Sequence, residues 1–336
     1  MKILIDSKHG LGDCVQIIPM LSILKENYPN SYIAVIVSSK TNAELLAMAP
    51  IAIDKFYYLN MQQINIKSFI KLVYQIRKEK FDYFIISPIT TKWKAKLFAC
   101  LTGAKNKIGE QYHNINLHKV DNSVHMVKRN INLLKEFCKI PDKIINPILK
   151  APQIDNFILT KKDKKIIGVC IGGGTASKYK DNIVYPRAWS IEKIKIIVEN
   201  LLQNSAKVVL FGGKDELRYL DYFDGIMSNP SVINFVGKTT ITESAFLAKQ
   251  CDLVIGVDTG MQHIADAVGT KTLSIFGPTN PKTHGAYSNN AKFIEVECSC
   301  KYCYGTEEYL SCNDRKCLND ISDNNVINKI KSILRI

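Results

Sequence analysis

Short apolar runs alternate with helical patterns along most of the chain, and this alternation limits the possible folds more than any other feature. The apolar runs are rich in β-branched residues; clear examples are "KILID" at 2–6 and "SYIAVIVSS" at 31–39. Near-continuous apolar strands separated by helices are typical of parallel sheets that helices cover on both faces. The pattern therefore predicts an α/β fold. The other expected strands lie at 81–87, 165–174, 206–213, 231–237, 251–257 and 271–277.

A proline-bearing stretch divides the chain. Residues 140–164 contain three prolines, lack clear periodicity, and precede the strand expected to start near Ile166. A chain of 336 residues also exceeds the usual size of one domain. We therefore expect two doubly wound domains facing a central cleft, at 1–150 and 151–320, followed by a C-terminal helix at 321–336. Ligands of such sheets bind beyond the carboxyl ends of the strands.

Positive charge is concentrated in the first half of the chain. Residues 1–150 contain 22 Lys and Arg against 11 Asp and Glu, a net charge of +11, and residues 151–336 contain 23 against 20, a net of +3; together these give the overall +14. Such a field attracts an anionic macromolecule or a membrane surface. Solvated surface lysines with no such partner would give the same composition.

Any membrane contact is expected to be peripheral, with no segment of the chain crossing the bilayer. No apolar run approaches the ~18–20 residues that span a bilayer, and residues 1–6 read as a strand rather than a signal peptide, so the cytoplasm is the simplest location. Residues 90–107 gather lysines, including Lys92 and Lys94, around Trp93 and Phe98. This segment could meet an anionic glycolipid at the inner face of the cytoplasmic membrane, or be a helix with a solvated lysine face.

The segment "GVDTGMQHIADAVG" at 256–269 places polar residues at a strand–helix joint. A helix starting near Gly260 would have one apolar stripe, with His263 off it; the stripe comprises Met261, Ile264, Ala265 and Val268. The unpaired N–H groups at the helix start, from Thr259 on, favour an anion such as phosphate. Asp258 suits sugar hydroxyls or a helix cap better. A capped helix with a surface histidine is the alternative.

Other loops at strand ends also offer ligand-binding groups. "GGGTASKYKDN" at 172–182 and "FGPTNP" at 276–281 could bind the same anion, although no Walker pattern is present. "GLGD" offers close backbone approach and a carboxylate before a helix, without the full dinucleotide fingerprint. Ordinary loops and an N-cap are the alternatives. The groups concerned are Thr175, Lys178, Lys180 and Thr279 in the second half, and Gly10, Gly12 and Asp13 in the first.

These segments together resemble glycosyltransferase family 9, the ADP-heptose:lipopolysaccharide heptosyltransferases. The resemblance rests on "GLGD" after the first strand, on D-T-G-x-x-H-x-A-x-x-x-G followed by F-G-P-T-x-P, and on a cysteine-bearing tail. It implies a glycosyltransferase B fold of two Rossmann-like domains, the first binding the acceptor and the second a nucleotide-sugar donor. It also implies that the C-terminal helix packs back toward the first domain.

The resemblance implies an inverting transfer of a sugar, expected to be heptose from ADP-heptose, to lipopolysaccharide core or a related surface glycan. Asp13 would act as the general base on the acceptor hydroxyl. The chain contains no Asp-x-Asp pair, so no catalytic metal is expected. The helix start at 259–261, His263 and a lysine, Lys178 or Lys180, would then stabilise the departing diphosphate.

The resemblance also places Glu243 near the nucleotide ribose. Thr240 and Glu243 match a capping box, which is compatible with that role. Alternative functions are the same fold acting on another nucleotide sugar or a protein acceptor, and a polyanion- or membrane-binding module without catalysis. The D-T-G-x-x-H segment disfavours a nucleotide-sugar 2-epimerase of similar fold. No nucleic-acid-binding motif is present.

Ten cysteines fall into two groups. Single cysteines in apolar or helical stretches are expected to be small core residues: Cys14, Cys100, Cys138, Cys170 and Cys251. The tail "CSCKYCYGTEEYLSCNDRKC" at 298–317 could bind structural Zn or Fe tetrahedrally, with four thiolates as ligands. Free thiols are the alternative in a reducing compartment. The expected ligands are Cys300, Cys303, Cys312 and Cys317.

Overall fold

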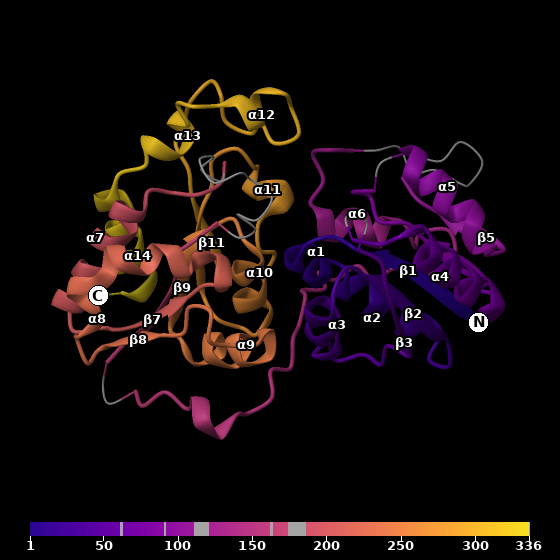
Figure 1. The fold of residues 1–336 in the computed structure, drawn as a ribbon, viewed down its shortest axis with the longest axis horizontal. Coiled ribbons are helices and arrows are strands. Elements are labelled where there is room, and N and C mark those ends of the chain that lie inside the picture. Colours follow the sequence, from indigo (N-terminus) through magenta and orange to yellow (C-terminus); the bar gives the residue numbers. More distant parts are fainter. Residues whose placement is uncertain (61–62, 91, 111–120, 162–163, 174–185, 336) are drawn as a thin grey trace. The chain divides into compact units, whose positions relative to one another are not determined.

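The computed structural model separates into two compact units, Met1–Lys150 and Ala151–Ile336, divided inside the proline-bearing stretch (Figure 1). Each unit has its own parallel sheet. No helix in the described residues is long and apolar enough to cross a membrane. The structure describes residues 1–60, 63–90, 92–110, 121–161, 164–173 and 186–335, apart from the side chains of residues 92–95 and 310.

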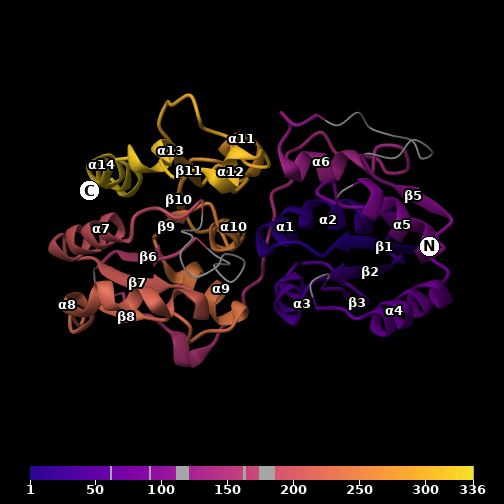
Figure 2. The same cartoon turned by 45° about the horizontal axis from the view of Figure 1, so that its top comes forward.

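The sheet of the first unit has the strand order β3-β2-β1-β4-β5, with every pair parallel. Its strands are β1 (Lys2–Ser7), β2 (Tyr32–Val37), β3 (Lys55–Tyr58), β4 (Tyr83–Ile85) and β5 (Asn106–Ile108). The central strand β1 is buried almost throughout, because helices cover both faces of the sheet (Figure 2). The order reverses between β1 and β4, which is the Rossmann-like arrangement expected from the alternating pattern.

In the described part of the first unit, six helices surround this sheet. They are α1 (Leu11–Gln16), α2 (Ile18–Asn27), α3 (Lys40–Ala47), α4 (Ile66–Glu79), α5 (Lys92–Thr102) and α6 (Met126–Asn132). Pro19 lies at the second position of α2, where its missing N–H breaks no helical hydrogen bond. The first helix starts at Leu11, whereas the sequence suggested that Asp13 precedes the helix. Ile17 separates α1 from α2.

The sheet of the second unit has the order β11-β10-β9-β6-β7-β8, again with every pair parallel. Its strands are β6 (Ile166–Cys170), β7 (Lys207–Phe211), β8 (Val232–Asn234), β9 (Leu253–Val257), β10 (Thr272–Ile275) and β11 (Ala291–Ile294). The order reverses between β6 and β9, so the second unit is a second Rossmann-like domain. The two sheets together match the expected α/β architecture.

Alternate residues of these strands enter two separate cores. One core joins Val208 and Leu210 to α7 (Ile191–Gln203) and the final helix α14 (Asp323–Leu334). The other joins Val209 to α9 and α10 on the opposite face. Successive residues of a strand point to opposite faces of the sheet, and here both sets are buried, one set in each core. The remaining helical elements are η1 (Asp155–Phe157), η3 (Lys214–Phe223), α8 (Asp224–Met227), α9 (Ile241–Gln250), α10 (Gly260–Ala267), α11 (Pro281–His284), α12 (Glu308–Ser311) and α13 (Lys316–Asn319).

The C-terminal helix α14 belongs to the second unit. Its apolar residues Val326, Ile330 and Leu334 are buried in the core that α7 also enters. Residues 321–336 therefore lie in the second compact unit, which ends at Ile336. The return of this helix toward the first domain, which the resemblance implied, stays a prediction.

Three strands were not expected from the sequence: β3, β5 and β11. All three are edge strands, and their sequences KFYY, NKI and AKFI are short and partly polar. An edge strand is covered less completely than a central strand, so it needs no continuous apolar run. Pairing with the neighbouring strand, rather than local pattern, decides that these segments are extended.

Candidate functional site

The two places where strand order reverses are the natural ligand sites of these sheets. In the second unit this place lies beyond the ends of β6 and β9, and in the first unit beyond β1 and β4. The chain leaves β9 at Val257 into Asp258 and leaves β1 at Ser7 into the loop that carries Asp13. Both polar segments singled out in the sequence therefore follow a central strand at its switch point.

Asp258 is a buried carboxylate with strong partners. It is 5% exposed, and its Oδ2 accepts hydrogen bonds from Arg187 Nη1 at 2.9 Å and from Thr279 Oγ1 at 2.7 Å. A buried charge is tolerated only when it is paired and hydrogen-bonded. Thr279 thus supports Asp258, although the sequence suggested that its hydroxyl would face a ligand. Asp258 does not cap α10, because Thr259 occupies the N-cap position.

Thr259 presents an unused polar group beside Asp258. Its backbone is extended at the N-cap of α10, but its side chain makes no capping hydrogen bond. Among the described residues, its buried Oγ1 has no hydrogen-bond partner at all. Buried hydroxyls are almost always hydrogen-bonded. A ligand that carries oxygen atoms would satisfy both this hydroxyl and the free N–H groups at the start of α10.

His263 is not a surface histidine. Its side chain is 8% exposed, and its Nε2 lies 4.0 Å from Asp258 Oδ1. The apolar stripe was predicted correctly, with Met261 and Ala265 in the core behind the sheet. The residues of α10 from Gln262 to Ala267 are all buried. Asp266 among them accepts hydrogen bonds from the backbone N–H groups of Tyr287 and Ser288. His263 therefore contributes to the Asp258 site.

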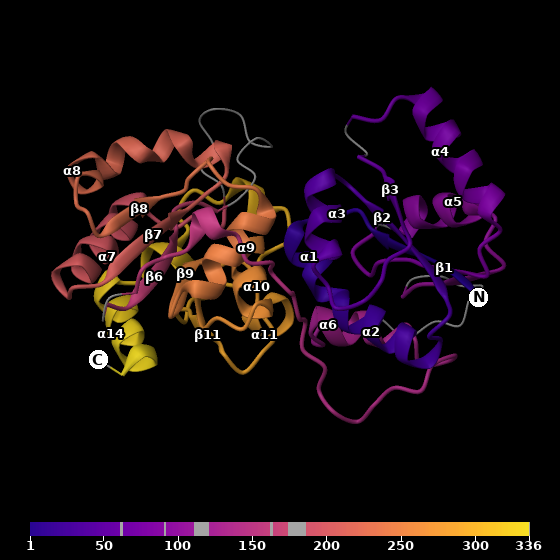
Figure 3. The same cartoon turned by 90° about the horizontal axis from the view of Figure 1, so that it is seen from below.

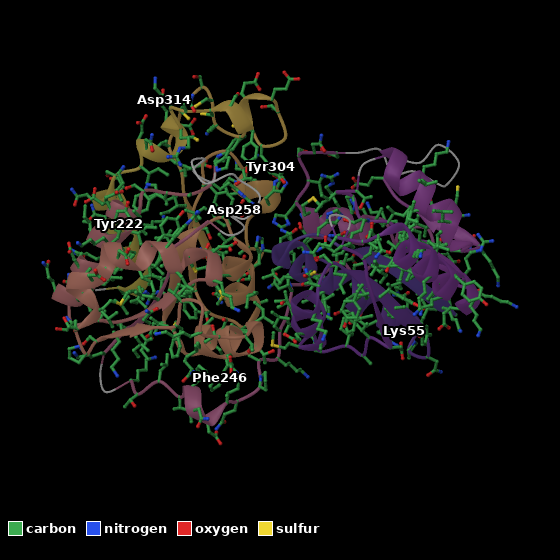
Figure 4. The ribbon with its side chains drawn as sticks, in the orientation of Figure 1. Lys55, Tyr222, Phe246, Asp258, Tyr304 and Asp314 are labelled. Carbon is green, nitrogen blue, oxygen red and sulfur yellow. The ribbon has the colours of Figure 1, made fainter. Side chains whose placement is uncertain are left out.

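Arg187 was missed by the sequence reading. Its guanidinium pairs with Asp258 and lies 5.7 Å from the centre of the Tyr304 ring. Figure 4 labels Asp258 and Tyr304 in the second unit. The segment "YPRAW" contains the only signal, an arginine directly after a proline that ends the glycine- and lysine-rich loop. Arg187 is 26% exposed in its side chain, so it joins the buried carboxylate to the surface. An arginine so placed is suited to a phosphate.

The cysteine-bearing tail forms a wall of this site. The N–H of Tyr304 donates to Pro278 O at 2.9 Å, and Trp189 Nε1 donates to Leu318 O at 3.1 Å. Gly277 lets the tail approach, because a Cβ there would lie 2.7 Å from Leu318 Cγ. The F-G-P-T segment therefore does two jobs: it supports Asp258 and it seats the tail.

A second buried carboxylate, Glu216, lies near the same strand ends and was also missed. It is 5% exposed, and its Oε2 accepts the N–H of Gly213 at 2.7 Å. A Cβ on Gly172, just after β6, would lie 2.2 Å from Glu216 Cγ. The sequence signal was "FGGKDE" directly after a strand. A carboxylate at this position can accept hydrogen bonds from ligand hydroxyls.

Glu243 forms the capping box of α9. Its Oε2 accepts the N–H of Thr240 at 2.7 Å, and Thr240 Oγ1 accepts the N–H of Glu243 at 3.3 Å. The structural role expected from the sequence is thus confirmed, and the ribose role stays a prediction. The candidate phosphate ligands Thr175, Lys178 and Lys180 lie outside the described residues.

The first-unit loop holds Asp13 in a reciprocal cap. Gly10 is the N-cap of α1, Gly12 is the second helical residue, and Asp13 is the third, so Asp13 lies inside the helix rather than before it. Asp13 Oδ2 accepts the Gly10 N–H at 2.8 Å. Among the described residues, Oδ1 accepts no hydrogen bond. The half-exposed carboxylate keeps one oxygen for a ligand.

A network of side chains fixes the loop in front of Asp13. Thr90 Oγ1 donates to Asp6 Oδ2 at 2.8 Å and lies 2.9 Å from His9 Nε2. Lys8 pairs with the same buried carboxylate of Asp6. Asn42 Nδ2 donates to His9 O at 3.1 Å. Hydrogen bonds from two sides therefore hold the loop that presents Asp13.

The lysine-rich segment forms the helix α5, and one of its two aromatic residues is buried. Phe98 is 7% exposed and packs against Phe69 and Phe84, so it belongs to the core of the first unit and cannot reach a membrane interface. The side chains of Lys92 and Lys94 lie outside the described residues. The sequence shows Phe98 among the lysines of this helix. It does not show which side of the helix packs against the sheet; only the tertiary structure does.

Four of the five single cysteines are buried, as expected, and Cys100 is exposed. Burial raises the pKa of the Cys14 thiol to about 11 and that of Cys170 to about 12, so these thiols stay protonated. In the tail, Cys298 Sγ and Cys300 Sγ lie 3.7 Å apart. Burial, then the nearby Cys300, raises the pKa of Cys317 to about 12.

No group of three or more potential ligands in the described residues could hold a metal ion. The predicted cysteine ligands are therefore not close enough together here to coordinate one ion. Metal binding by Cys300, Cys303, Cys312 and Cys317 stays a prediction.

Comparison with known proteins identifies the family. The chain is 25% identical over 343 residues to lipooligosaccharide heptosyltransferase 2 of Campylobacter jejuni subsp. jejuni serotype O:6, covering 99% of each protein. The fold matches a glycosyl transferase family 9 structure from Veillonella parvula (TM-score 0.82, 20% identity, 99% and 97% of the two chains). It also matches ADP-heptose lps heptosyltransferase II of E. coli (TM-score 0.76, 20% identity, 100% and 99%).

These structural matches cover essentially the whole chain, including both Rossmann-like domains, and such an arrangement is the glycosyltransferase B fold. The sequence profile of glycosyltransferase family 9 (heptosyltransferase) matches residues 69–313, which is most of the chain. The protein is a glycosyltransferase, and it belongs to glycosyltransferase family 9.

Proposed function

We propose that this protein transfers heptose from ADP-heptose to lipopolysaccharide core or a related surface glycan, with inversion at the anomeric carbon. The single observation that carries the proposal is the Asp258–Arg187 pair beside the unpartnered hydroxyl of Thr259 at the start of α10. This arrangement offers both a cation for phosphate and acceptors for sugar hydroxyls. The C. jejuni and E. coli relatives, named as heptosyltransferases, support heptose as the sugar.

The second unit would bind the donor. Negative charge builds up on the diphosphate as its bond to the sugar breaks. The N-terminal N–H groups of α10, with the adjacent Arg187 guanidinium, provide positive potential for that charge. Asp258 has Arg187 and Thr279 on Oδ2, so Oδ1 faces His263 and is available to a sugar hydroxyl. Glu243 or Glu216 would accept hydrogen bonds from the ribose.

The first unit would bind the acceptor. Asp13 would take the proton from an acceptor hydroxyl while that oxygen attacks the anomeric carbon and the nucleoside diphosphate leaves from the opposite side. General-base catalysis needs a carboxylate oxygen within reach of the proton. The bond from Gly10 to Oδ2 fixes the orientation of Asp13 and leaves Oδ1 for this task. The acceptor would be an anionic glycolipid at the inner face of the cytoplasmic membrane.

The nucleotide preference tests the donor. Ligand binding to the folded state raises stability by about 2.7 kcal/mol at a hundredfold excess over Kd. We expect ADP to raise the Tm of the purified protein more than UDP, GDP or CMP in a thermal-shift panel. A larger shift with UDP would reject ADP-heptose as the donor while leaving a transferase of another nucleotide sugar.

The general base is tested by removing only its charge. Asp13→Asn keeps an oxygen for the Gly10 N–H but cannot take a proton, so the transfer rate should fall about 10²–10⁴-fold with an unchanged ADP shift. Asp142→Asn, an exposed carboxylate of the same unit, is the matched control and should keep full activity. Unchanged turnover in Asp13→Asn or Asp13→Ala would remove Asp13 from the mechanism.

We also propose that the cysteine tail binds one structural Zn or Fe ion. In a tetrahedral site with metal–sulfur bonds of about 2.3 Å, adjacent thiolates lie roughly 3.8 Å apart. Two thiols of the tail, Cys298 and Cys300, lie 3.7 Å apart, although only Cys300 is one of the four expected ligands. The Arg315 N–H donates to Cys312 Sγ, a bond that would stabilise a thiolate. Metal analysis should give about one ion per chain, lost in Cys300→Ser but retained in the exposed single-cysteine control Cys100→Ser. A metal-free native protein would contradict it.

A further inference from the structure

Helix α4 carries two apolar faces, and only one of them is covered. Leu72 and Ile76 are buried in the core of the first unit, as a helix beside a sheet requires. On the other side, Ile66, Ile70 and Tyr74 are 77%, 63% and 67% exposed. Single exposed apolar residues are common on protein surfaces, but three at a spacing of four form a continuous stripe. This stripe has no structural role within its unit.

Helix geometry defines the exposed surface further. At 3.6 residues per turn, Ile66, Ile70 and Tyr74 occupy a sector of about 80° and a length of about 12 Å. Lys67, Lys71 and Lys78 occupy the adjoining sector, within about 60° of Tyr74. These lysines are all exposed. The apolar stripe and the lysine row therefore lie side by side along α4. We call these six residues the α4 face.

Within α4, no acidic side chain lies on the α4 face. Glu79 is the only acidic residue of α4, and it lies on another side of the helix, paired with Lys2 and Lys55. Arg77 lies in the same sector as the stripe, about one turn beyond Tyr74, and its guanidinium donates to Leu101 O in α5. Contacts between α4 and α5 hold the helix at the outer side of the first unit (Figure 3).

A groove borders the lysine row. It has a volume of about 1120 Å³ and lies between β3 and α4. Its lining includes Lys71 and Lys78 from the α4 face, Lys40 and Lys55 from elsewhere in the unit, and Glu79, whose carboxylate pairs with Lys55. Ser38, at one end of this groove, donates to His9 O in the loop before Asp13. The positive surface therefore continues from α4 toward the loop that holds the proposed base.

An apolar stripe next to a lysine row fits an anionic bilayer. Apolar side chains of an interfacial helix enter the headgroup–acyl boundary, while the lysine stems let their ammonium groups reach lipid phosphates. A second copy of this chain would fit poorly in an antiparallel two-fold contact, because the two lysine rows would then lie on the same side and repel. An acidic protein would satisfy the lysines but would need an apolar groove for the stripe.

We propose that the α4 face docks the protein on an anionic lipid bilayer, with Ile66, Ile70 and Tyr74 at the interface and the lysine row on lipid phosphates. The expected membrane segment was α5; of its two aromatic residues, Phe98 is buried in the core, and the side chain of Trp93 lies outside the described residues. The biological meaning rests on the proposed glycolipid acceptor, whereas the binding itself needs no transferase activity.

Vesicle co-sedimentation of the full-length protein tests the proposal. We expect binding to vesicles of phosphatidylglycerol and phosphatidylcholine, weak binding to phosphatidylcholine alone, and a decline with added salt. The double variant Lys67→Gln/Lys71→Gln should lower partitioning about 25-fold, because each lysine near the surface contributes about fivefold. The double variant Ile66→Ser/Ile70→Ser should lower it about tenfold or more at high salt, where the apolar stripe dominates.

Matched variants keep the test specific. Lys135→Gln/Lys139→Gln and Ile144→Ser/Ile148→Ser remove equal charge and similarly exposed apolar residues elsewhere in the unit, and should bind as the parent protein does. Equal losses in these controls, or no vesicle binding by the parent protein, would overturn the proposal. So would a change from dimer to monomer in the isoleucine variant without any vesicle binding by the parent.

The two proposals can fail separately. The α4 variants should still transfer sugar to a delipidated, water-soluble acceptor, because α4 contributes no residue to the candidate site. If vesicle binding is absent while that transfer persists, the docking proposal fails and the proposed function stands. If vesicles bind but no nucleotide stabilises the protein, the proposed function fails and docking stands.

Discussion

Single residues of the donor site are interdependent because they share one buried charge. Asp258 carries that charge, Arg187 balances it, and Thr279 supplies a further hydrogen bond. The sequence predicted that Asp258 matters, since it follows an apolar strand and precedes a helix. It could not predict the partner, because Arg187 lies 71 residues away in the chain and only the fold brings the two together.

Removing the partner of Asp258 should destabilise the protein. In Arg187→Met the carboxylate stays buried without its cation, so the free energy of unfolding should fall by about 1.5–3 kcal/mol. Arg187→Lys should recover part of this loss. Urea unfolding measures the change, and the exposed Arg218→Met is the control, expected within about 0.5 kcal/mol of the parent. Equal unfolding free energies for Arg187→Met and Arg218→Met would contradict a structural role for the ion pair.

At the scale of elements, short loops after the strands position the site. α10 was recognised because its apolar stripe has the helical period, and β9 because it is a continuous apolar run. His263 was judged from the stripe alone; the alternative of a surface histidine is wrong, because His263 is 7% exposed, and its contact with a ligand stays a prediction. Helical periodicity identifies the face of a helix that packs against one core. It does not show whether another segment covers the opposite face.

The contact between the F-G-P-T loop and the tail gives a test at this scale. A Cβ in Gly277→Ala would lie 2.7 Å from Leu318 Cγ and 3.0 Å from Cys317 Sγ, so the tail would have to shift. Such overpacking costs about 1–3 kcal/mol. Gly225→Ala is the matched control, because its Cβ would meet nothing within 4 Å in α8, and alanine favours helix. Thermal unfolding should show a lower Tm for the first variant only; an equal Tm for both would refute the close approach.

At the scale of the whole molecule, each unit is a complete Rossmann-like domain with its own core. α14 completes the second core by burying Val326 and Leu334 against the face that α7 covers. The second unit thus contains every described residue of the proposed donor site. Its stability and its nucleotide binding should not require the first unit.

The isolated fragment 151–336 tests this independence. It should unfold in one cooperative transition and show an ADP-induced Tm shift within about 2 °C of the full chain under equal ligand excess, since the same contacts bind the ligand. A fragment ending at residue 320 is the control and should fail to fold, because it lacks the apolar face of α14. Loss of the ADP shift in a folded 151–336 fragment would place part of the donor site outside the second unit.

The sequence by itself determined the fold class, the central strands and the position of the switch-point loops. It could do so because buried central strands need continuous apolar runs, and because the residues that follow such a strand always emerge at its carboxyl end. The family resemblance, which the comparisons confirmed, came from the same loops. Both kinds of information are local in the chain.

Only the tertiary structure decided which groups meet. It paired Arg187 with Asp258, buried His263, moved Phe98 into a core and left the outer stripe of α4 uncovered. Each of these outcomes depends on segments far apart in the sequence packing against one another, and local periodicity carries no information about such partners. The edge strands follow the same logic, because hydrogen bonding to a neighbour, rather than their own composition, makes them extended.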